Sequence, residues 1–185
     1  MNTVESLHSQ LDAIVREFES ASERLERLRR GLPPEAWSRR PAPGQWSPGE
    51  CVAHLNLTSA AFLPLLRGGL DQARRTRHTP GARYRRDMVG WLLWRMVSAP
   101  GRYKTRTTAP FVPSGHRPAD ELVAEFERYQ AAQIALTREA DGLAIDRVKV
   151  VSPFNPRIRY TIFSALSILA RHQHRHLWQA EQASR

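Results

Sequence analysis

The chain has 185 residues, a formal net charge of +10 and a single cysteine, Cys51. With 41% hydrophobic and 25% charged residues it is neither disordered nor fibrous, and its length is typical of one domain. No run approaches the roughly 20 apolar residues of a membrane span, and the N-terminal residues lack the pattern of a secretory signal. We therefore expect one soluble, cytoplasmic domain over residues 1–185, without a transmembrane segment or an internal disulfide.

The first helix is predicted over residues 3–30, because apolar residues recur there at steps of three and four with charges between them. A second helix should begin at Ser47, where Ser47-Pro48-Gly49-Glu50 forms a capping box. We expect this helix to end at about Leu66, since Pro64 and then Gly68-Gly69 interrupt it.

Positive charge is concentrated in the connection that follows, over residues 67–115. Residues 67–106 alone hold ten arginines and Lys104 against only Asp71 and Asp87. The electrostatic field of such a positive segment can attract nucleic acid, anionic lipid or a carboxylated substrate. The alternative is that the segment is only exposed to solvent, as most runs of charged residues are. No signature of a nucleic-acid-binding module is present, so we expect no specific nucleic-acid partner.

A short helix is predicted within residues 87–97 of this connection. Its two tryptophans, Trp91 and Trp94, lie close in sequence to several arginines. This combination fits an interfacial patch, but it equally fits a cover over the core or the contact of a homodimer. The alternatives stay open at this point.

A third long helix is expected from about Pro118 to Gly142, then an extended piece at residues 147–151, and a last helix from about Arg159 to Gln182. Four long amphipathic helices without a run of strands predict an all-α fold, an antiparallel four-helix bundle. The long connection between the second and third helices predicts a crossover rather than simple hairpins.

Two histidines continue the apolar stripe of the last helix. Its inward positions advance by steps of three and four residues and end at His172 and His176. Side chains four residues apart on a helix have Cβ atoms about 5–6 Å apart, so that two imidazoles can reach one ion. His174 lies two positions from each and is expected on the solvent face.

The second helix supplies a third inward imidazole, His54, among apolar neighbours such as Leu55 and Phe62. Three inward histidines on two helices of one bundle form a candidate metal site with positions left open for water or substrate. The alternative is three histidines packed in the core. Cys51, one turn before His54, is either a fourth ligand or a small buried hydrophobic residue.

Three stretches together resemble the DinB/YfiT-like superfamily of proposed metalloenzymes, in particular its DinB-like subfamily. They are Gln45-Trp46-Ser47-Pro48-Gly49-Glu50-Cys51-Val52-Ala53-His54-Leu55, Val150-Val151-Ser152-Pro153-Phe154 and His172-Gln173-His174-Arg175-His176-Leu177-Trp178-Gln179. The resemblance implies a four-helix bundle with a long crossover, and a divalent metal held by His54, His172 and His176. Characterised relatives include transferases and isomerases that use bacillithiol, mycothiol or glutathione.

An ion held by three neutral imidazoles keeps its full +2 charge and lowers the pKa of a bound water or thiol toward neutrality. We therefore predict a metal-dependent enzyme acting on a small molecule, either a hydrolase or an S-transferase with a low-molecular-weight thiol as cosubstrate. Zinc, nickel, iron and manganese all accept imidazole. The alternatives are a basic binding module for an acidic surface and a catalytically inactive metal-binding stress protein. Gln179 is a candidate to orient a ligand, unless it is an ordinary surface residue.

Overall fold

The computed structural model describes residues 7–76, 79, 81–98, 107–115 and 117–185. Its helices are α1 (Ser9–Gly31), α2 (Pro48–Arg75), α3 (Met88–Val97), α4 (Ala119–Glu139) and α5 (Ile162–Ala183). Its strands are β1 (Lys149–Ser152) and β2 (Asn155–Thr161), and two short 3-10 turns are η1 (Pro34–Trp37) and η2 (Ala109–Phe111). None of the described helices is long and apolar enough to cross a membrane.

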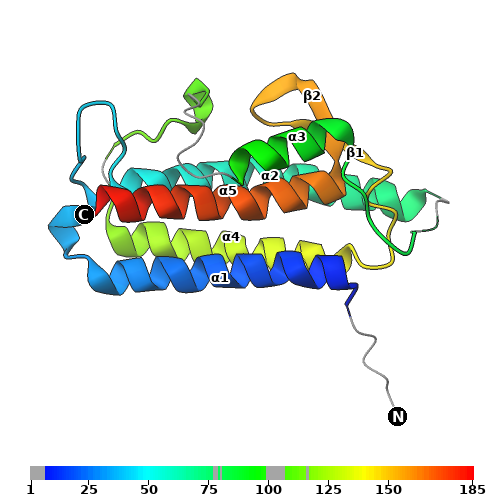
Figure 1. Ribbon diagram of the computed structural model, residues 1–185, viewed down its shortest axis with the longest axis horizontal. Coiled ribbons are helices and arrows are strands. Elements are labelled where there is room, and N and C mark those ends of the chain that lie inside the picture. Colours follow the sequence, from blue (N-terminus) through cyan, green and yellow to red (C-terminus); the bar gives the residue numbers. More distant parts are fainter. Residues whose placement is uncertain (1–6, 77–78, 80, 99–106, 116) are drawn as a thin grey trace, which may run out of the picture.

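Four long helices form the bundle, and α3 and the hairpin lie beside it (Figure 1). Helices α1 and α2 each pack against both α4 and α5. The chain runs one way in α1 and α5 and the opposite way in α2 and α4 (Figure 1). Because α2 and α4 run in the same direction, the chain has to return along the bundle between them. The predicted helical bundle with a long crossover is therefore confirmed, and α3 and η2 lie within that crossover.

The capping box expected at the start of α2 is present. The Ser47 hydroxyl accepts a hydrogen bond from the backbone N–H of Glu50 at 3.2 Å, and the Glu50 carboxylate accepts one from the N–H of Ser47 at 2.9 Å. These bonds satisfy backbone donors that have no partner within the helix. They fix where α2 begins, with the N-cap residue Ser47 seven residues before His54.

The expected end of α2 near Leu66 is wrong, since the helix continues through Pro64 to Arg75. Gly69 explains part of the difference. A Cβ atom there would lie 2.9 Å from Cδ1 of Ile162 and 3.0 Å from Cγ1 of Val150, so glycine permits close packing against α5 and β1. Tertiary packing outweighs the low helix propensity of glycine here.

The expected start of the last helix at Arg159 is also wrong. Residues 155–161 form β2, which pairs antiparallel with β1 in a register that places Lys149 opposite Thr161. Helix α5 begins at Ile162, and the Thr161 hydroxyl caps it by accepting from the N–H of Ser164 at 3.2 Å. The extended piece predicted at 147–151 corresponds to β1.

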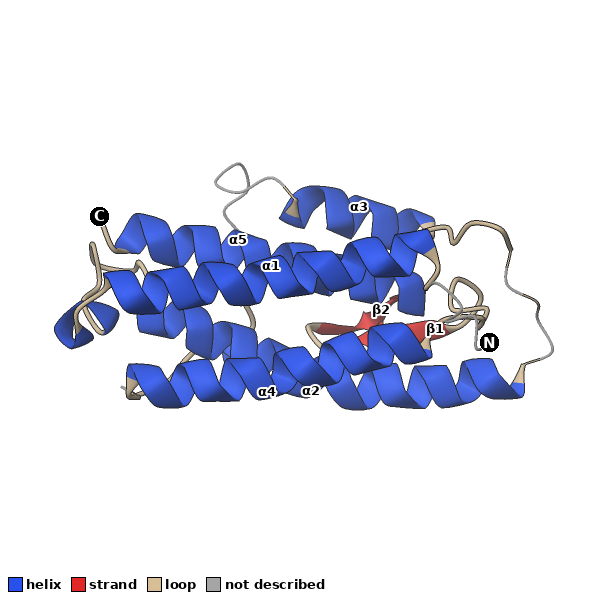
Figure 2. Ribbon diagram, turned by 90° about the horizontal axis from the view of Figure 1, so that it is seen from below, coloured by secondary structure: helices blue, strands red, loops and turns tan. Residues whose placement is uncertain are grey.

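Helix α3, the predicted short helix of the crossover, packs against α5 (Figure 2). Gly90 makes the contact close, because a Cβ atom there would lie 2.1 Å from the Ser164 hydroxyl oxygen. Asp87, at the N-terminus of α3, accepts hydrogen bonds from the Ser164 hydroxyl at 2.8 Å and from the N–H of Thr161 at 3.2 Å. The part of the basic segment at residues 99–106, with Lys104, lies outside the described residues.

Candidate metal centre

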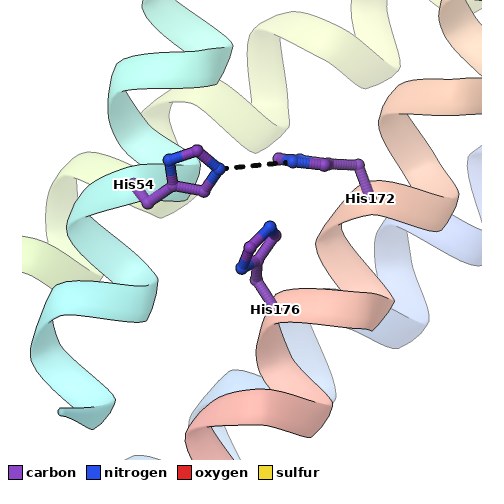
Figure 3. A group of neighbouring side chains, drawn as sticks. All are labelled: His54, His172 and His176. Carbon is purple, nitrogen blue, oxygen red and sulfur yellow. Dashed lines mark hydrogen bonds between the residues drawn. The ribbon is translucent and has the colours of Figure 1, made fainter. Parts of the chain in front are cut away.

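The three predicted histidines come together between α2 and α5. Figure 3 shows the ring of His54 pointing from α2 toward the rings of His172 and His176, which project from successive turns of α5. The ring centroids lie 4.4 to 5.1 Å apart. One ligand nitrogen of each residue lies within 4.8 Å of the others. The three ligand nitrogens are therefore close enough together to hold one metal ion.

A backbone carbonyl sets the orientation of His54. Its Nδ1 atom lies 2.7 Å from the carbonyl oxygen of Phe111 in η2. Because a carbonyl oxygen only accepts, Nδ1 carries the proton and donates, and Nε2 keeps its lone pair. That Nε2 atom lies 3.3 Å from Nε2 of His172 (Figure 3). The hydrogen bond thus aims the basic nitrogen of His54 at the other two histidines.

Burial keeps the three imidazoles neutral. It lowers the pKa of His54, which is 1% exposed, although the Phe111 carbonyl acts in the opposite direction. Burial, followed by the charges of neighbouring groups, holds the pKa values of His172 and His176 well below 6.5. The side chain of Gln179 forms a hydrogen bond with His176. This bond raises the pKa of His176, but burial lowers it by more. Neutral imidazole is the form that binds metal ions.

The donor set fits a divalent metal ion. Nδ1 of His172 and Nδ1 of His176 are buried and have no hydrogen-bond partner among the described residues. Nε2 of His172, not its unpartnered Nδ1, faces Nε2 of His54, and one ligand nitrogen of each ring lies within 4.8 Å of the others, a spacing that one ion can bridge. Three protein ligands are also the number found in catalytic zinc sites, which keep a position open.

Aromatic rings surround the histidines. The Trp46 ring centroid lies 4.9 Å from that of His54 and 5.9 Å from that of His176. The ring centroid of Phe154, in the hairpin turn, lies 6.0 Å from that of His172 and 4.3 Å from that of Phe111. These rings come from the segment before α2, from the crossover and from the hairpin, so three connections help to enclose the group.

Two other candidates have different roles. Cys51 is 0% exposed in a hydrophobic cluster, and burial raises the pKa of its thiol to about 12. It is outside the histidine group, so the structure favours the buried hydrophobic residue over the fourth ligand. The expectation that His174 faces solvent is wrong. His174 is half-buried, and its Nε2 lies 3.0 Å from the carbonyl oxygen of Glu17 in α1.

Phe111 could not be predicted as part of the site from the sequence. Its contribution to the site is a backbone carbonyl, which every residue type carries, so no side-chain pattern marks it. Trp46 and Phe154 lay within the stretches that carry the family resemblance, but their positions beside the histidines come from the structure.

Comparison with known proteins identifies a family. The model of the DinB superfamily matches residues 17–180, a range that contains all three histidines. Neither a search of curated proteins nor a search of solved structures found a match. The matched range covers most of the chain and agrees with the helical bundle. The chain therefore belongs to the DinB superfamily.

Proposed function

We propose that this protein is a metal-dependent enzyme in which His54, His172 and His176 bind one divalent ion. The observation that carries the proposal is the convergence of three neutral imidazoles, with one ligand nitrogen of each within 4.8 Å of the others. When bound, a divalent ion of this kind supplies Lewis acidity and lowers the pKa of a water or thiol toward neutrality. Zinc, nickel, iron and manganese all suit imidazole donors.

The surrounding residues prepare this site. The Phe111 carbonyl holds the His54 ring in one tautomer and one orientation, as outer partners of metal-binding histidines do. Trp46 and Phe154 place apolar surface next to the imidazoles. Such a surface limits the access of water and strengthens electrostatic interactions at the donor nitrogens.

The reaction that we propose is attack of the thiolate of a low-molecular-weight thiol on an electrophilic small molecule, with hydrolysis as the alternative. A carbon–sulfur bond forms, and the electrophile either releases its leaving group with the electron pair or takes up a proton at the atom that receives the pair. Both need a nucleophile that is deprotonated near neutral pH, a thiolate in the first case and hydroxide in the second. The thiol-dependent version draws on the resemblance to DinB-like relatives that use such thiols. Membership of the superfamily supports this version.

The test is a panel of reactions with metal-loaded protein. Bacillithiol, mycothiol and glutathione are each offered with a set of electrophiles, and esters and amides are offered without thiol. Product formation that requires both metal and thiol supports the S-transferase, and thiol-independent cleavage supports the hydrolase. Either activity should disappear in His176→Ala and persist in His174→Ala, a matched control on the same helix.

Failure has a defined meaning in this panel. If protein with stoichiometric metal turns over no substrate, the result favours the catalytically inactive metal-binding alternative. If activity is equal in the wild type and in His176→Ala, the three-histidine site is not where the reaction occurs.

A further inference from the structure

Helix α3 presents apolar side chains on its outer face as well as on its inner face. Met88 is 83% exposed, Trp91 49% and Leu92 52%. Their spacing of three and four residues places them on one side of the helix. The inner face, with Leu93 and Trp94, packs against the core. A surface helix normally turns polar residues outward, so the packing among the described residues does not explain the outer stripe.

The two tryptophans of this helix are in different environments. Trp94 is covered, because the guanidinium carbon of Arg86 lies 4.4 Å from its ring centroid and that of Arg171 5.8 Å. Trp91 faces outward, with the guanidinium carbon of Arg95 at 5.9 Å from its ring centroid. The cover over the core that the sequence allowed therefore accounts for Trp94 alone.

Exposed arginines lie within α3 and on the segments next to it. Arg83 and Arg85 precede α3 and are exposed, and Arg95 is exposed within it. Arg159, also exposed, is on β2, which packs against α3. Two carboxylates of the described residues lie next to these arginines. Asp87 accepts from the Ser164 hydroxyl and the N–H of Thr161 and pairs with Lys149 at 3.8 Å, and Asp146 accepts from the backbone N–H of Arg85 at 3.4 Å. The outer face of α3 thus carries exposed apolar side chains, with Arg95 over Trp91 and further exposed arginines on the adjoining segments.

We propose that the outer face of α3 docks onto an anionic lipid surface. Tryptophan, leucine and methionine side chains on such a face insert at the boundary between headgroups and acyl chains, while arginines bind the lipid phosphates. This combination uses both the apolar stripe and the arginines on and next to α3. The proposal is independent of the metal site and concerns where the protein is located, not what it catalyses.

Two other occupants match the surface less well. A two-fold dimer through this face would bring the same patch of both copies together, and the arginines of one copy would face those of the other. A nucleic acid would pair with the arginines through its phosphates but would leave the exposed Met88 and Leu92 without an apolar partner. The lipid surface complements both features.

The experiment is co-sedimentation of the full-length, metal-loaded protein with vesicles. Vesicles of phosphatidylcholine with phosphatidylglycerol are compared with vesicles of phosphatidylcholine alone. We expect binding to the anionic vesicles only, and weaker binding as salt screens the arginines. The double variant Trp91→Ser/Leu92→Ser should lose this binding. Arg85→Gln/Arg95→Gln should bind about 30-fold more weakly, which is about fivefold for each arginine.

Matched control variants are available on other parts of the surface. Leu57 on α2 is 39% exposed, and the Arg16 side chain on α1 is 67% exposed. Leu57→Ser and Arg16→Gln should bind vesicles as the wild type does. All variants should keep the wild-type circular dichroism spectrum and metal content, because the substituted side chains are exposed.

Several results would overturn the proposal. One is that the wild type fails to bind anionic vesicles at low salt. Another is that the wild type and both α3 variants bind these vesicles equally. A dimer in solution that Trp91→Ser/Leu92→Ser dissociates would assign the face to a second copy instead. Binding of duplex DNA or RNA that depends on Arg85 and Arg95 but not on Trp91 and Leu92, without vesicle binding, would assign it to nucleic acid.

Discussion

The Nδ1 atom of His54 lies 2.7 Å from the backbone carbonyl oxygen of Phe111, 57 residues further along the chain. This hydrogen bond connects α2 to η2, a turn within the crossover. The crossover therefore does more than return the chain along the bundle, because it orients one of the three imidazoles.

The first prediction concerns Phe111. Its side chain is 5% exposed, and its ring lies 4.3 Å from that of Phe154, so the packing of this ring holds the carbonyl in place. Phe111→Leu should lower metal affinity by about 10-fold, the lower end of the effect of outer partners of metal ligands. Competition with a chromophoric chelator measures the affinity. Val112→Ala, at the adjacent 47% exposed position, is the control, and equal affinity of the two variants would contradict this role.

The histidine pair of the last helix could be predicted from the sequence because helix periodicity is a local property. The apolar stripe that includes Leu169 continues directly into His172 and His176, and residues four apart share a face. His54 was found in the same way on the second helix. The unsatisfied nitrogens and the hydrogen bond to the crossover required the structure, since they depend on contacts between distant segments.

The fold was predictable where local signals were strong. The capping box at Ser47 gave the start of α2 correctly. The end of α2 was missed because Gly69 serves tertiary packing against Ile162, which its local propensity does not reveal. The strand at 155–161 was missed because its formation depends on pairing with β1.

The second prediction concerns acid stability of the metal-free protein. In the folded state burial lowers the pKa of His54, and it holds those of His172 and His176 well below 6.5, whereas the unfolded chain protonates its histidines near 6.5. The unfolded chain therefore binds more protons in this window, and the free energy of unfolding rises with pH. The stabilisation is fully present above about pH 6.5 and is lost as the pH falls toward the folded-state values.

Urea unfolding at about pH 7.5 and about pH 5.5 measures this dependence. Metal-free His176→Gln should lose less stability between these two pH values than the metal-free wild type, because it has one buried imidazole fewer. The same loss in both proteins would show that His176 is not buried in its neutral form.

The third prediction concerns Cys51, the single cysteine of the chain. Its thiol is buried, and its pKa is raised to about 12, so almost no thiolate exists at neutral pH. Because the thiolate is the reactive form, a thiol reagent should leave the native protein unlabelled and should react once per chain after unfolding. Removal of the metal from folded protein should not change this. Labelling that begins only when the metal is removed would instead identify Cys51 as a ligand.

The fourth prediction concerns thermal stability. Metal that binds only the folded state stabilises it by about 2.7 kcal/mol at 100 times its Kd. For a domain of this size, that corresponds to a rise in Tm of roughly 5–11 °C. A melt of the wild type with and without chelator measures the shift, and His172→Ala should show none. An unchanged Tm in wild-type protein shown to be metal-free would mean that the ion does not bind selectively to the folded state.

We expect His172 and His176 to be the only histidines of α5 that bind the metal ion, together with His54 of α2. His174 provides the sharpest control, because it lies between His172 and His176 but contacts the Glu17 carbonyl. His174→Ala should lose about 0.5–1.5 kcal/mol of stability with that hydrogen bond and should keep its metal.

The most direct measurement is elemental analysis of protein purified without chelating resin. The wild type and His174→Ala should each contain close to one divalent ion per chain. His54→Ala, His172→Ala and His176→Ala should contain far less while keeping a helical circular dichroism spectrum. Equal metal content in the wild type and these three variants, or an equal loss in His174→Ala and His172→Ala, would contradict the three-histidine site.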